Sequence, residues 1–321
     1  MSERMSEQMS QRNQMRVAVV GATGFQGGAV ARLLSSRGHR VRTLSRRPEG
    51  DRPPLPGVSC ATGDLGDAES VRQLFAGATH AAVVLPLVYE AGRVRAYARN
   101  IAAAAVAAGV RRLVYNANTR VPRAATEVAA FETRRIAEEV LRESGVPLVV
   151  LRPPVYLDNL FSPWNGPALV NEGILAYPLP ADVPTAWLSH RDLAEAVCAA
   201  LTAEGAEGRA YDIGGERALT GDELAEAFGR GLGRAVRYRA LAPHLFEQGL
   251  AQAVGPAAAA GVAGVYHYMA RGAEPLLLAG DDGVSAGALT LRPRPVDEWV
   301  SRQPWQIWAS DPEEQDAQTL T

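Results

Sequence analysis

Short apolar runs alternate with longer amphipathic stretches from Arg16 onward. The apolar runs predict six strands, which are RVAVV, RVRTLS, VSCA, HAAVVL, RRLVYN and PLVVLR. The stretches between them predict helices at about 24–37, 67–75, 89–108 and 126–144. Strands that alternate with helices are typical of a parallel sheet that is covered on both faces. The pattern therefore predicts an α/β fold with a Rossmann-type, doubly wound parallel sheet.

Beyond Arg152 the pattern changes to Pro-rich and aromatic-rich sequence, PPVYLDNLFSPWNGPALV. Helical patterns return in SHRDLAEAVCAAL and TGDELAEAFGRGL, and Thr220 with Glu223 predicts a capping box at the start of the second. Insertions at the carboxyl edge of such a sheet typically build a binding lobe. We therefore expect a dinucleotide-binding domain over 15–152. A small C-terminal substrate lobe makes up most of 153–310, with some segments returning to the Rossmann core.

The composition excludes several classes of function. The 321 residues carry a net charge of −2, and 33 basic residues are scattered against 35 acidic ones. This distribution lacks the clustered positive face that nucleic acid requires. Every basic residue is arginine, which excludes a lysine base or Schiff-base nucleophile. Cys60 and Cys198 show no metal-ligand spacing, so we expect two reduced thiols and no metal site.

The two ends of the chain are polar. Residues 1–14 lack the apolar core of a signal peptide and are predicted to form a disordered leader, and 311–321 to form a disordered acidic tail. No apolar run reaches the roughly 20 residues that a bilayer crossing needs. We therefore expect a cytoplasmic protein that acts on a small molecule, without a membrane or nucleic-acid partner. A homodimer is left open.

The stretch VVGATGFQGGAV places Gly21, Gly24 and Gly27 directly after the first predicted strand and at the opening of a helix. In dinucleotide-binding folds the first glycine permits a tight turn, the second lets the backbone approach the pyrophosphate, and the third allows close helix packing. The helix N-terminus adds amides and the positive end of a dipole. We therefore predict a pyrophosphate site here, with Thr23 and Phe25 as further contacts.

The second predicted strand ends in TLSRRP, where an NAD-specific site carries an acidic residue for the ribose 2′-hydroxyl. Ser45, Arg46 and Arg47 stand there instead, and a guanidinium can pair the 2′-phosphate that a carboxylate would repel. These residues predict NADP(H) as the cofactor; the alternative is two solvated arginines on a turn. Asp64, after the third strand, can meet the adenine amino group or cap the next helix, for which Asp67 is better placed.

Five segments, GATGFQG, LSRRP, GDLGD, FETRRIAEEVLRESGVPLVVLRPPVYLDN and AYDIGGERALTGDELAEAF, together resemble the NmrA-like branch of the atypical short-chain dehydrogenases/reductases. The resemblance covers nearly all of 16–299. It implies a Rossmann-type domain with a small C-terminal substrate lobe, NADP(H) or NAD(H), and either a quinone or enone reductase or a redox-sensing regulator. We also expect the cofactor to contact the residues that end later strands, namely Leu85, Pro86, Asn116 and Pro153.

Reductases of the wider superfamily carry a tyrosine four residues before a lysine, and a Ser or Thr at the end of the fifth strand. The resemblance puts Ala130, Arg134 and Asn118 at these positions. Arg134 can hold the nicotinamide ribose and offer positive charge, but it cannot usefully donate a proton. The Asn118 amide can orient a substrate carbonyl, or the residue can simply form a turn.

Because this tyrosine is missing, the superfamily pattern does not identify the residue that donates the proton. We predict Tyr156 in PPVYLDN as a catalytic residue with Asn118 and Arg134, and we keep Tyr89 and His190 as alternatives. General acid assistance typically contributes 10²- to 10⁴-fold, so its loss slows hydride transfer without forbidding it. A substrate that delocalises the developing charge tolerates this loss best.

The sequence therefore predicts an NADPH-dependent oxidoreductase of a conjugated or aromatic carbonyl compound, such as a quinone, an enone or a polyketide-like ketone. A role in secondary metabolism would suit such substrates, and the aromatic lobe suits a flat, apolar ligand. Two alternatives stay open. One is a non-catalytic NADP(H)-sensing regulator, and the other is a non-redox biosynthetic enzyme that keeps the cofactor as a scaffold.

Overall fold

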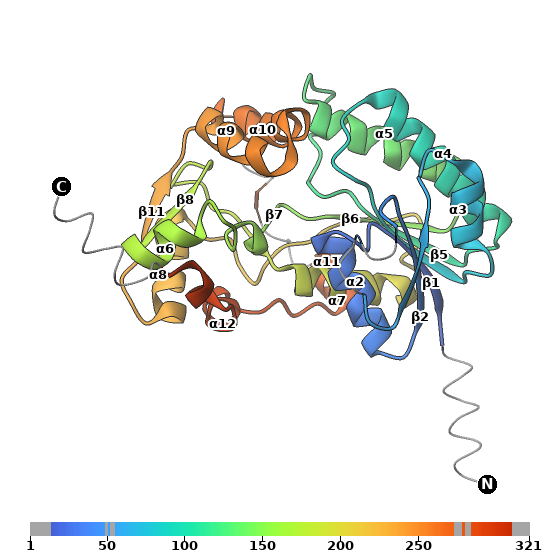
Figure 1. Ribbon diagram of the computed structural model, residues 1–321, viewed down its shortest axis with the longest axis horizontal. Helices are drawn as coiled ribbons and strands as arrows, with labels where there is room; N and C mark the ends of the chain where they lie inside the picture. Colours follow the sequence, from blue (N-terminus) through green and yellow to red (C-terminus); the bar gives the residue numbers. More distant parts are fainter. Residues whose placement is uncertain (1–13, 49–50, 52–54, 273–277, 280–283, 310–321) are drawn as a thin grey trace, which may run out of the picture. The chain divides into compact units, whose positions relative to one another are not determined.

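The computed structural model describes residues 14–48, 51, 55–272, 278–279 and 284–309 (Figure 1). The predicted leader, apart from Gln14, and the predicted acidic tail lie outside these residues. By its internal contacts the chain divides into two compact units. The first comprises Met1–Pro153, His190–Ile213 and Asp282–Leu291, and the second comprises Pro154–Ser189, Gly214–Asp281 and Arg292–Thr321. Within the described ranges, no helix combines the length and the apolar character that a membrane crossing requires.

The first unit is built on a seven-stranded sheet in the order β10-β6-β5-β4-β1-β2-β3, with every pair parallel. The strands are β1 (Arg16–Val20), β2 (Arg40–Ser45), β3 (Val58–Thr62), β4 (His80–Val84), β5 (Arg112–Asn116), β6 (Leu148–Arg152) and β10 (Ala210–Asp212). The predicted doubly wound sheet is confirmed. The strand order reverses between β1 and β4, and in such folds a dinucleotide binds at the carboxyl ends of the strands beside this reversal.

Helices cover both faces of this sheet. They are α2 (Phe25–Ser36), α3 (Ala68–Phe75), α4 (Ala91–Ala107), α5 (Ala129–Glu143), α7 (His190–Thr202) and α11 (Val284–Leu289). Helices α3, α4 and α5 pack side by side, whereas α2 packs against α7, and Figure 1 shows these two groups on opposite sides of the strands. Asp67 caps α3 by accepting hydrogen bonds from the amides of Glu69 and Ser70 at 3.2 and 3.0 Å. Asp67 is therefore the cap, as its spacing predicts.

The main core lies between the sheet and the layer formed by α3, α4 and α5. It contains Phe75 from α3, Ile101 from α4 and Tyr115 from β5, all of them fully buried. On β5, buried Arg112 donates hydrogen bonds to the carbonyls of Ala200 and Ala203, both at 2.8 Å. The contact ties the middle of the sheet to the end of α7, so the later segment His190–Ile213 is an integral part of this unit.

The second unit contains two short parallel sheets. Strand β8 (Ile174–Tyr177) pairs with β11 (Arg237–Ala240), and β7 (Val155–Tyr156) pairs with β9 (Trp187–Leu188). Its helices are α6 (Gly166–Glu172), α8 (Gly221–Leu232), α9 (Pro243–Val254), α10 (Pro256–Ala270) and α12 (Val296–Ser301), with the 3-10 turns η1 (Leu157–Asn159) and η3 (Trp305–Trp308). The capping box that Thr220 and Glu223 predict at the start of α8 is confirmed.

Aromatic side chains form the core of this second unit. The ring of Tyr177 packs edge-on against Trp187 at 4.9 Å between centroids and against Tyr266 at 5.5 Å. The Tyr177 hydroxyl lies 2.5 Å from that of Tyr266 and accepts a hydrogen bond from Asn159 at 3.0 Å. Tyr177 and Trp187 are both buried, so these two aromatic side chains serve packing inside the unit.

Candidate functional site

The loop between β1 and α2 presents open backbone amides. Gly24 caps α2 without any side-chain hydrogen bond, and the first turn contains no acidic residue. The Gly24 amide donates to the Gly21 carbonyl at 3.0 Å, but no described residue accepts a hydrogen bond from the amides of 25–27. Thr23 is exposed, and Phe25 is 86% exposed. A helix start with free amides and no carboxylate favours an anion, so the loop has the properties on which the predicted pyrophosphate site depends.

The three glycines of this loop meet different constraints. Gly21 has a φ of 84°, and a Cβ there would lie 2.6 Å from the carbonyl oxygen of Val84. A Cβ on Gly27 would lie 2.3 Å from the Gly21 carbonyl oxygen. A Cβ on Gly24 would meet only that same oxygen, at 3.4 Å, which is ordinary contact. The fold itself therefore requires glycine at 21 and 27, whereas a side chain at 24 would project into space that the described residues do not fill.

The turn after β2 exposes two arginines. The buried Ser45 hydroxyl accepts a hydrogen bond from the Arg47 amide at 3.1 Å, and the Ser45 carbonyl accepts one from the Gly63 amide at 2.9 Å. These bonds fix the backbone of the turn and leave the side chains of Arg46 and Arg47 exposed. No described residue forms an ion pair or hydrogen bond with the Arg46 guanidinium. Arg46 is thus available to an anionic ligand.

Asp64 forms a turn after β3. Its Oδ1 accepts a hydrogen bond from the Gly66 amide at 2.7 Å, and its carbonyl accepts one from the Asp67 amide at 3.1 Å. The cap of α3 is Asp67, so the capping alternative for Asp64 is wrong. Its second carboxylate oxygen has no hydrogen-bond donor among the described residues. That oxygen is the atom that can meet an adenine amino group.

Two asparagines shape the end of β5. The buried Asn116 side chain donates to Gln26 Oε1 at 3.0 Å and to Asn118 Oδ1 at 3.2 Å, and its Oδ1 accepts the Asn118 amide at 2.9 Å. Asn118 adopts a φ of 63°, a left-handed conformation that asparagine tolerates. Asn116 therefore ties β5 to the first turn of α2. Asn118 forms a turn, and no described residue accepts a hydrogen bond from its Nδ2.

Arg134 on α5 is buried and has no ion-pair partner among the described residues. Its side chain is 2% exposed, Nη1 is fully enclosed, and no described residue forms an ion pair or hydrogen bond with the guanidinium. The guanidinium lies over the ring of Tyr89, with 5.4 Å between the guanidinium carbon and the ring centroid. An unpaired buried charge is costly to a folded protein. The position therefore suits a guanidinium whose partner is a ligand.

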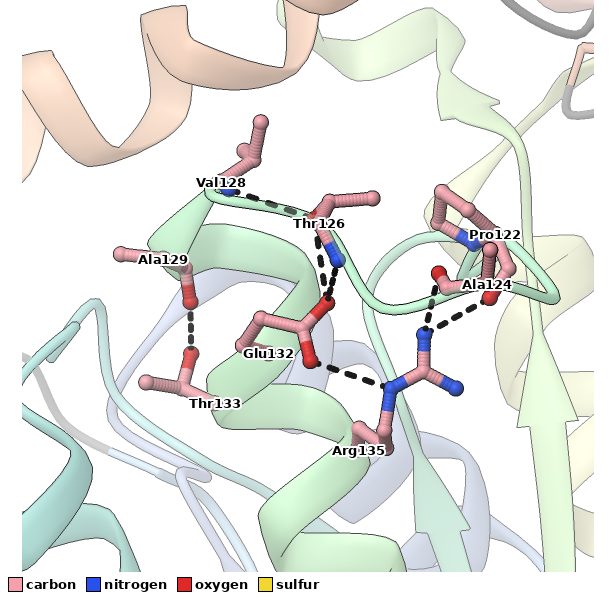
Figure 2. Close-up of polar contacts among 8 residues, drawn as sticks. All are labelled: Pro122, Ala124, Thr126, Val128, Ala129, Glu132, Thr133 and Arg135. Carbon is pink, nitrogen blue, oxygen red and sulfur yellow. Dashed lines mark hydrogen bonds and ion pairs between the residues drawn. The ribbon is translucent and has the colours of Figure 1, made fainter.

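Arg135, the next residue on α5, differs from Arg134 because its guanidinium has protein partners (Figure 2). Arg135 donates to the carbonyls of Pro122 and Ala124 at 2.7 and 3.0 Å, and its Nε pairs with Glu132 at 3.1 Å. Glu132 in turn accepts the amide and the hydroxyl of Thr126 at 2.9 and 3.0 Å. This network fixes the segment before α5, so Arg135 has a structural role. Within the described part of the chain, the neighbouring Arg134 has no equivalent set of acceptors.

The remaining predicted residues lie in several places. Ala130 is buried and contributes no polar group. Leu85 is part of the apolar core, so only its backbone can face a cofactor, whereas Pro86 is partly exposed. Pro153 ends the first continuous segment of the first unit.

The three candidate proton donors are separated. Tyr89 lies against Arg134, whereas His190 begins α7 and stacks on Phe25 at 6.5 Å between ring centroids. Tyr156 belongs to the second unit, where it is buried in β7. Of these candidates, the structure therefore brings Tyr89 together with a predicted catalytic residue inside one unit.

Known proteins share both the sequence and the fold. A profile of the NmrA-like family matches residues 13–299. The (4-alkanoyl-5-oxo-2,5-dihydrofuran-3-yl)methyl phosphate reductase of Streptomyces griseus subsp. griseus is 36% identical over 225 residues, which cover 70% of this chain and 77% of that protein. The NAD(P)H azoreductase of Xenophilus azovorans is 30% identical over 227 residues, with the same two coverages.

A solved structure gives a similar result for the fold. The crystal structure of NmrA, a negative transcriptional regulator, in complex with NADP matches with a TM-score of 0.68 at 20% identity. The match covers 95% of this chain and 98% of that chain. With the family profile over 13–299 and the parallel sheet that carries the glycine loop, these findings show that the chain belongs to the NmrA-like family.

Proposed function

We propose that this protein is an NADPH-dependent reductase of conjugated or aromatic carbonyl compounds. The observation that carries the proposal is the buried guanidinium of Arg134, which has no ion-pair or hydrogen-bond partner among the described residues. It lies on the helix that follows β5, in the same unit as the open amides of 25–27. In this proposal the first unit holds the cofactor, and the substrate is a flat, apolar small molecule.

The cofactor of this proposal is NADP(H). Arg46 is exposed at the end of β2 and has no partner among the described residues, so its guanidinium can pair a 2′-phosphate. The loop amides of 25–27 and the space above Gly24 accept the pyrophosphate, and Asp64 Oδ2 meets the adenine. The relatives support this assignment, since one is an NAD(P)H azoreductase and another was solved with NADP.

Removing the Arg46 guanidinium tests the choice between the two nicotinamide cofactors. We expect Arg46→Ala to weaken NADPH binding by about 1.5–3 kcal/mol, the worth of a charged hydrogen bond, and to leave NADH nearly unchanged. Calorimetric titration of both cofactors measures the effect. Arg40→Ala is the matched control, because Arg40 is an exposed arginine at the opposite end of the same strand. Equal affinities of the unaltered protein for NADPH and NADH would rule out the assignment.

The residues at the site also limit the substrate. When bound, the dihydronicotinamide supplies a hydride. Arg134 provides a fixed positive charge for the negative charge that develops on the substrate, and the Asn118 amide can donate a hydrogen bond to its carbonyl. Neither group replaces the tyrosine absent from position 130, so a substrate that delocalises charge is favoured. The names of both relatives describe reductases, one of them of a ring that carries carbonyl groups.

The substrate class is tested by following NADPH oxidation with a panel of compounds. Quinones, enones and aromatic polyketide-like ketones form one set, and simple aliphatic ketones form the control set. We expect turnover with the conjugated set and rates at least ~100-fold lower with the aliphatic set, within the range that proton assistance typically contributes. Turnover of both sets at similar rates would contradict the substrate assignment.

A second candidate function is an NADP(H)-responsive regulator that does not turn over. The absence of tyrosine at 130 and of lysine at 134 favours it, since these two residues carry the chemistry in reductases of the wider superfamily. Tight NADPH binding with no oxidation across the whole panel would support the regulator. Conversion of a substrate without net NADPH consumption would instead support a non-redox enzyme.

A further inference from the structure

Tyr89 and Arg134 form a pair between two segments that follow neighbouring strands of the sheet. Tyr89 follows β4, Arg134 lies on the helix that follows β5, and β4 pairs with β5 in the sheet. The guanidinium carbon lies 5.4 Å from the centre of the phenol ring. Tyr89 is partly exposed, and none of the described residues forms a hydrogen bond with its hydroxyl. The hydroxyl is therefore available to a ligand.

We infer that Tyr89 is the proton donor of the reaction, and that its phenol performs the role of the tyrosine absent from position 130. This inference rests on the proposed function. NADPH, when bound, would supply a hydride to the electrophilic carbon of the substrate, and negative charge would then develop on the carbonyl oxygen. That oxygen takes the proton of the Tyr89 hydroxyl, and the phenolate then regains a proton from water. The net change is oxidation of NADPH to NADP⁺ and addition of two hydrogens to the substrate.

Arg134 stabilises the phenolate that this step leaves behind. A cation over an aromatic ring within about 6 Å is attracted to it, and the attraction grows when the ring becomes negative. Burial raises the pKa of Tyr89 above its ordinary value, and Arg134 acts in the opposite direction. The donor is therefore protonated at neutral pH and has a cation ready for its conjugate base.

Two other tyrosines of the same unit do not fit this role. Tyr115 also lies near Arg134, but it is 0% exposed and its hydroxyl is enclosed without a partner among the described residues. Burial raises the pKa of Tyr115 to about 12. Tyr97 has Arg93 over its ring at 5.5 Å, but its hydroxyl already accepts a hydrogen bond from Arg93 Nε at 2.7 Å. Tyr89 differs from both because its side chain is partly exposed and no described residue forms a hydrogen bond with its hydroxyl.

The pairing can be measured without any cofactor. Incorporating 3,5-difluorotyrosine at position 89 brings its ionisation to a lower pH, at which its ultraviolet absorbance can be titrated in the folded protein. The titration is run with Arg134 and with Arg134→Gln. We expect a higher pKa for residue 89 in the Arg134→Gln protein, because the phenolate loses its stabilising cation. Equal values in the two proteins would show that Arg134 does not act on this phenol.

Kinetics then test the proton transfer itself. With an enone or quinone that the unaltered protein reduces, Tyr89→Phe should lower kcat by at least ~100-fold, the lower end of general acid assistance, and leave the dissociation constant for NADPH unchanged. Tyr115→Phe is the matched control and should change neither. In the difluorotyrosine protein the alkaline limb of the kcat/KM profile should move to lower pH, because the donor loses its proton earlier. An unmoved limb would overturn the inference.

An error in the assignment of Tyr89 and an error in the proposed reductase would give different experimental results. A fully active Tyr89→Phe protein overturns Tyr89 as donor and leaves the proposed reductase in place. An unaltered protein that binds NADPH but oxidises none with any conjugated substrate overturns the reductase, and with it the proton-transfer step. The absorbance titration, which involves no turnover, separates a failed pairing from a failed reaction.

Discussion

Replacing Gly24 by valine is expected to abolish NADPH binding while the protein still folds. A Cβ at this position meets only the Gly21 carbonyl oxygen, at 3.4 Å, so the fold has room for it. The two methyl groups of valine would occupy the space in front of the free amides of 25–27, where the pyrophosphate is proposed to lie. Each charged hydrogen bond to these amides is worth about 1.5–3 kcal/mol, so losing two or more removes measurable affinity.

Gly27→Ala is the matched control for this substitution. Its Cβ would lie 2.3 Å from the Gly21 carbonyl oxygen and 2.5 Å from the carbonyl carbon, so the added methyl group forces the loop apart. We expect a clear loss of thermal stability for Gly27→Ala and little for Gly24→Val. Circular dichroism melting gives the stability, and calorimetry gives the affinity. Normal NADPH binding by folded Gly24→Val would show that this loop is not the phosphate site.

Removing the charge of Arg134 is expected to weaken function and to stabilise the protein in the absence of ligand. Arg134→Ala should cost about 1.5–3 kcal/mol of NADPH binding and should lower turnover, whereas Arg134→Lys should retain much of both because the positive charge remains. Arg134→Met should raise the free energy of unfolding by about 1–4 kcal/mol, since it replaces a buried charge by an apolar side chain of similar size. Calorimetry, NADPH oxidation and denaturant unfolding measure the three effects.

Arg135 provides the control for this pair of effects. Arg135→Ala removes the partner of Glu132 and of two backbone carbonyls, so we expect lower stability and an unchanged NADPH affinity in the folded protein. The opposite signs of the stability changes at these adjacent positions separate a binding role from a structural one. A destabilised Arg134→Met protein with normal NADPH affinity would assign Arg134 to the fold.

The sequence predicts the strands and helices of the first unit well because their signals are local. The six predicted strands end within one residue of the observed ones, since apolar runs bounded by turns mark buried parallel strands. Strand β10 (Ala210–Asp212) was not predicted, because it has three residues of which only Tyr211 is buried. Its place beside β6 depends on a pairing between residues 60 positions apart in the sequence, which no local pattern indicates.

The candidate site was predictable where backbone geometry determines it, and less so where side chains meet. The glycine spacing and Arg46 follow directly from the sequence. Gln26 was missed because its bond to Asn116 joins segments 90 residues apart. The burial of Arg134 and its contact with Tyr89 likewise depend on the neighbouring ends of β4 and β5. From the sequence alone, Tyr89 is one of three candidate proton donors. Its contact with Arg134 distinguishes it from His190 and Tyr156.

The transfer of deuterium from NADPH labelled at C4 tests the central claim most directly. The protein is incubated with a conjugated enone and each of the two C4-deuterated forms of NADPH, and the product is analysed by mass spectrometry. We expect the reduced product from one of the two forms to carry one carbon-bound deuterium, in step with NADPH oxidation. A product without deuterium from either form, or a product that appears without NADPH consumption, would contradict hydride transfer by this protein.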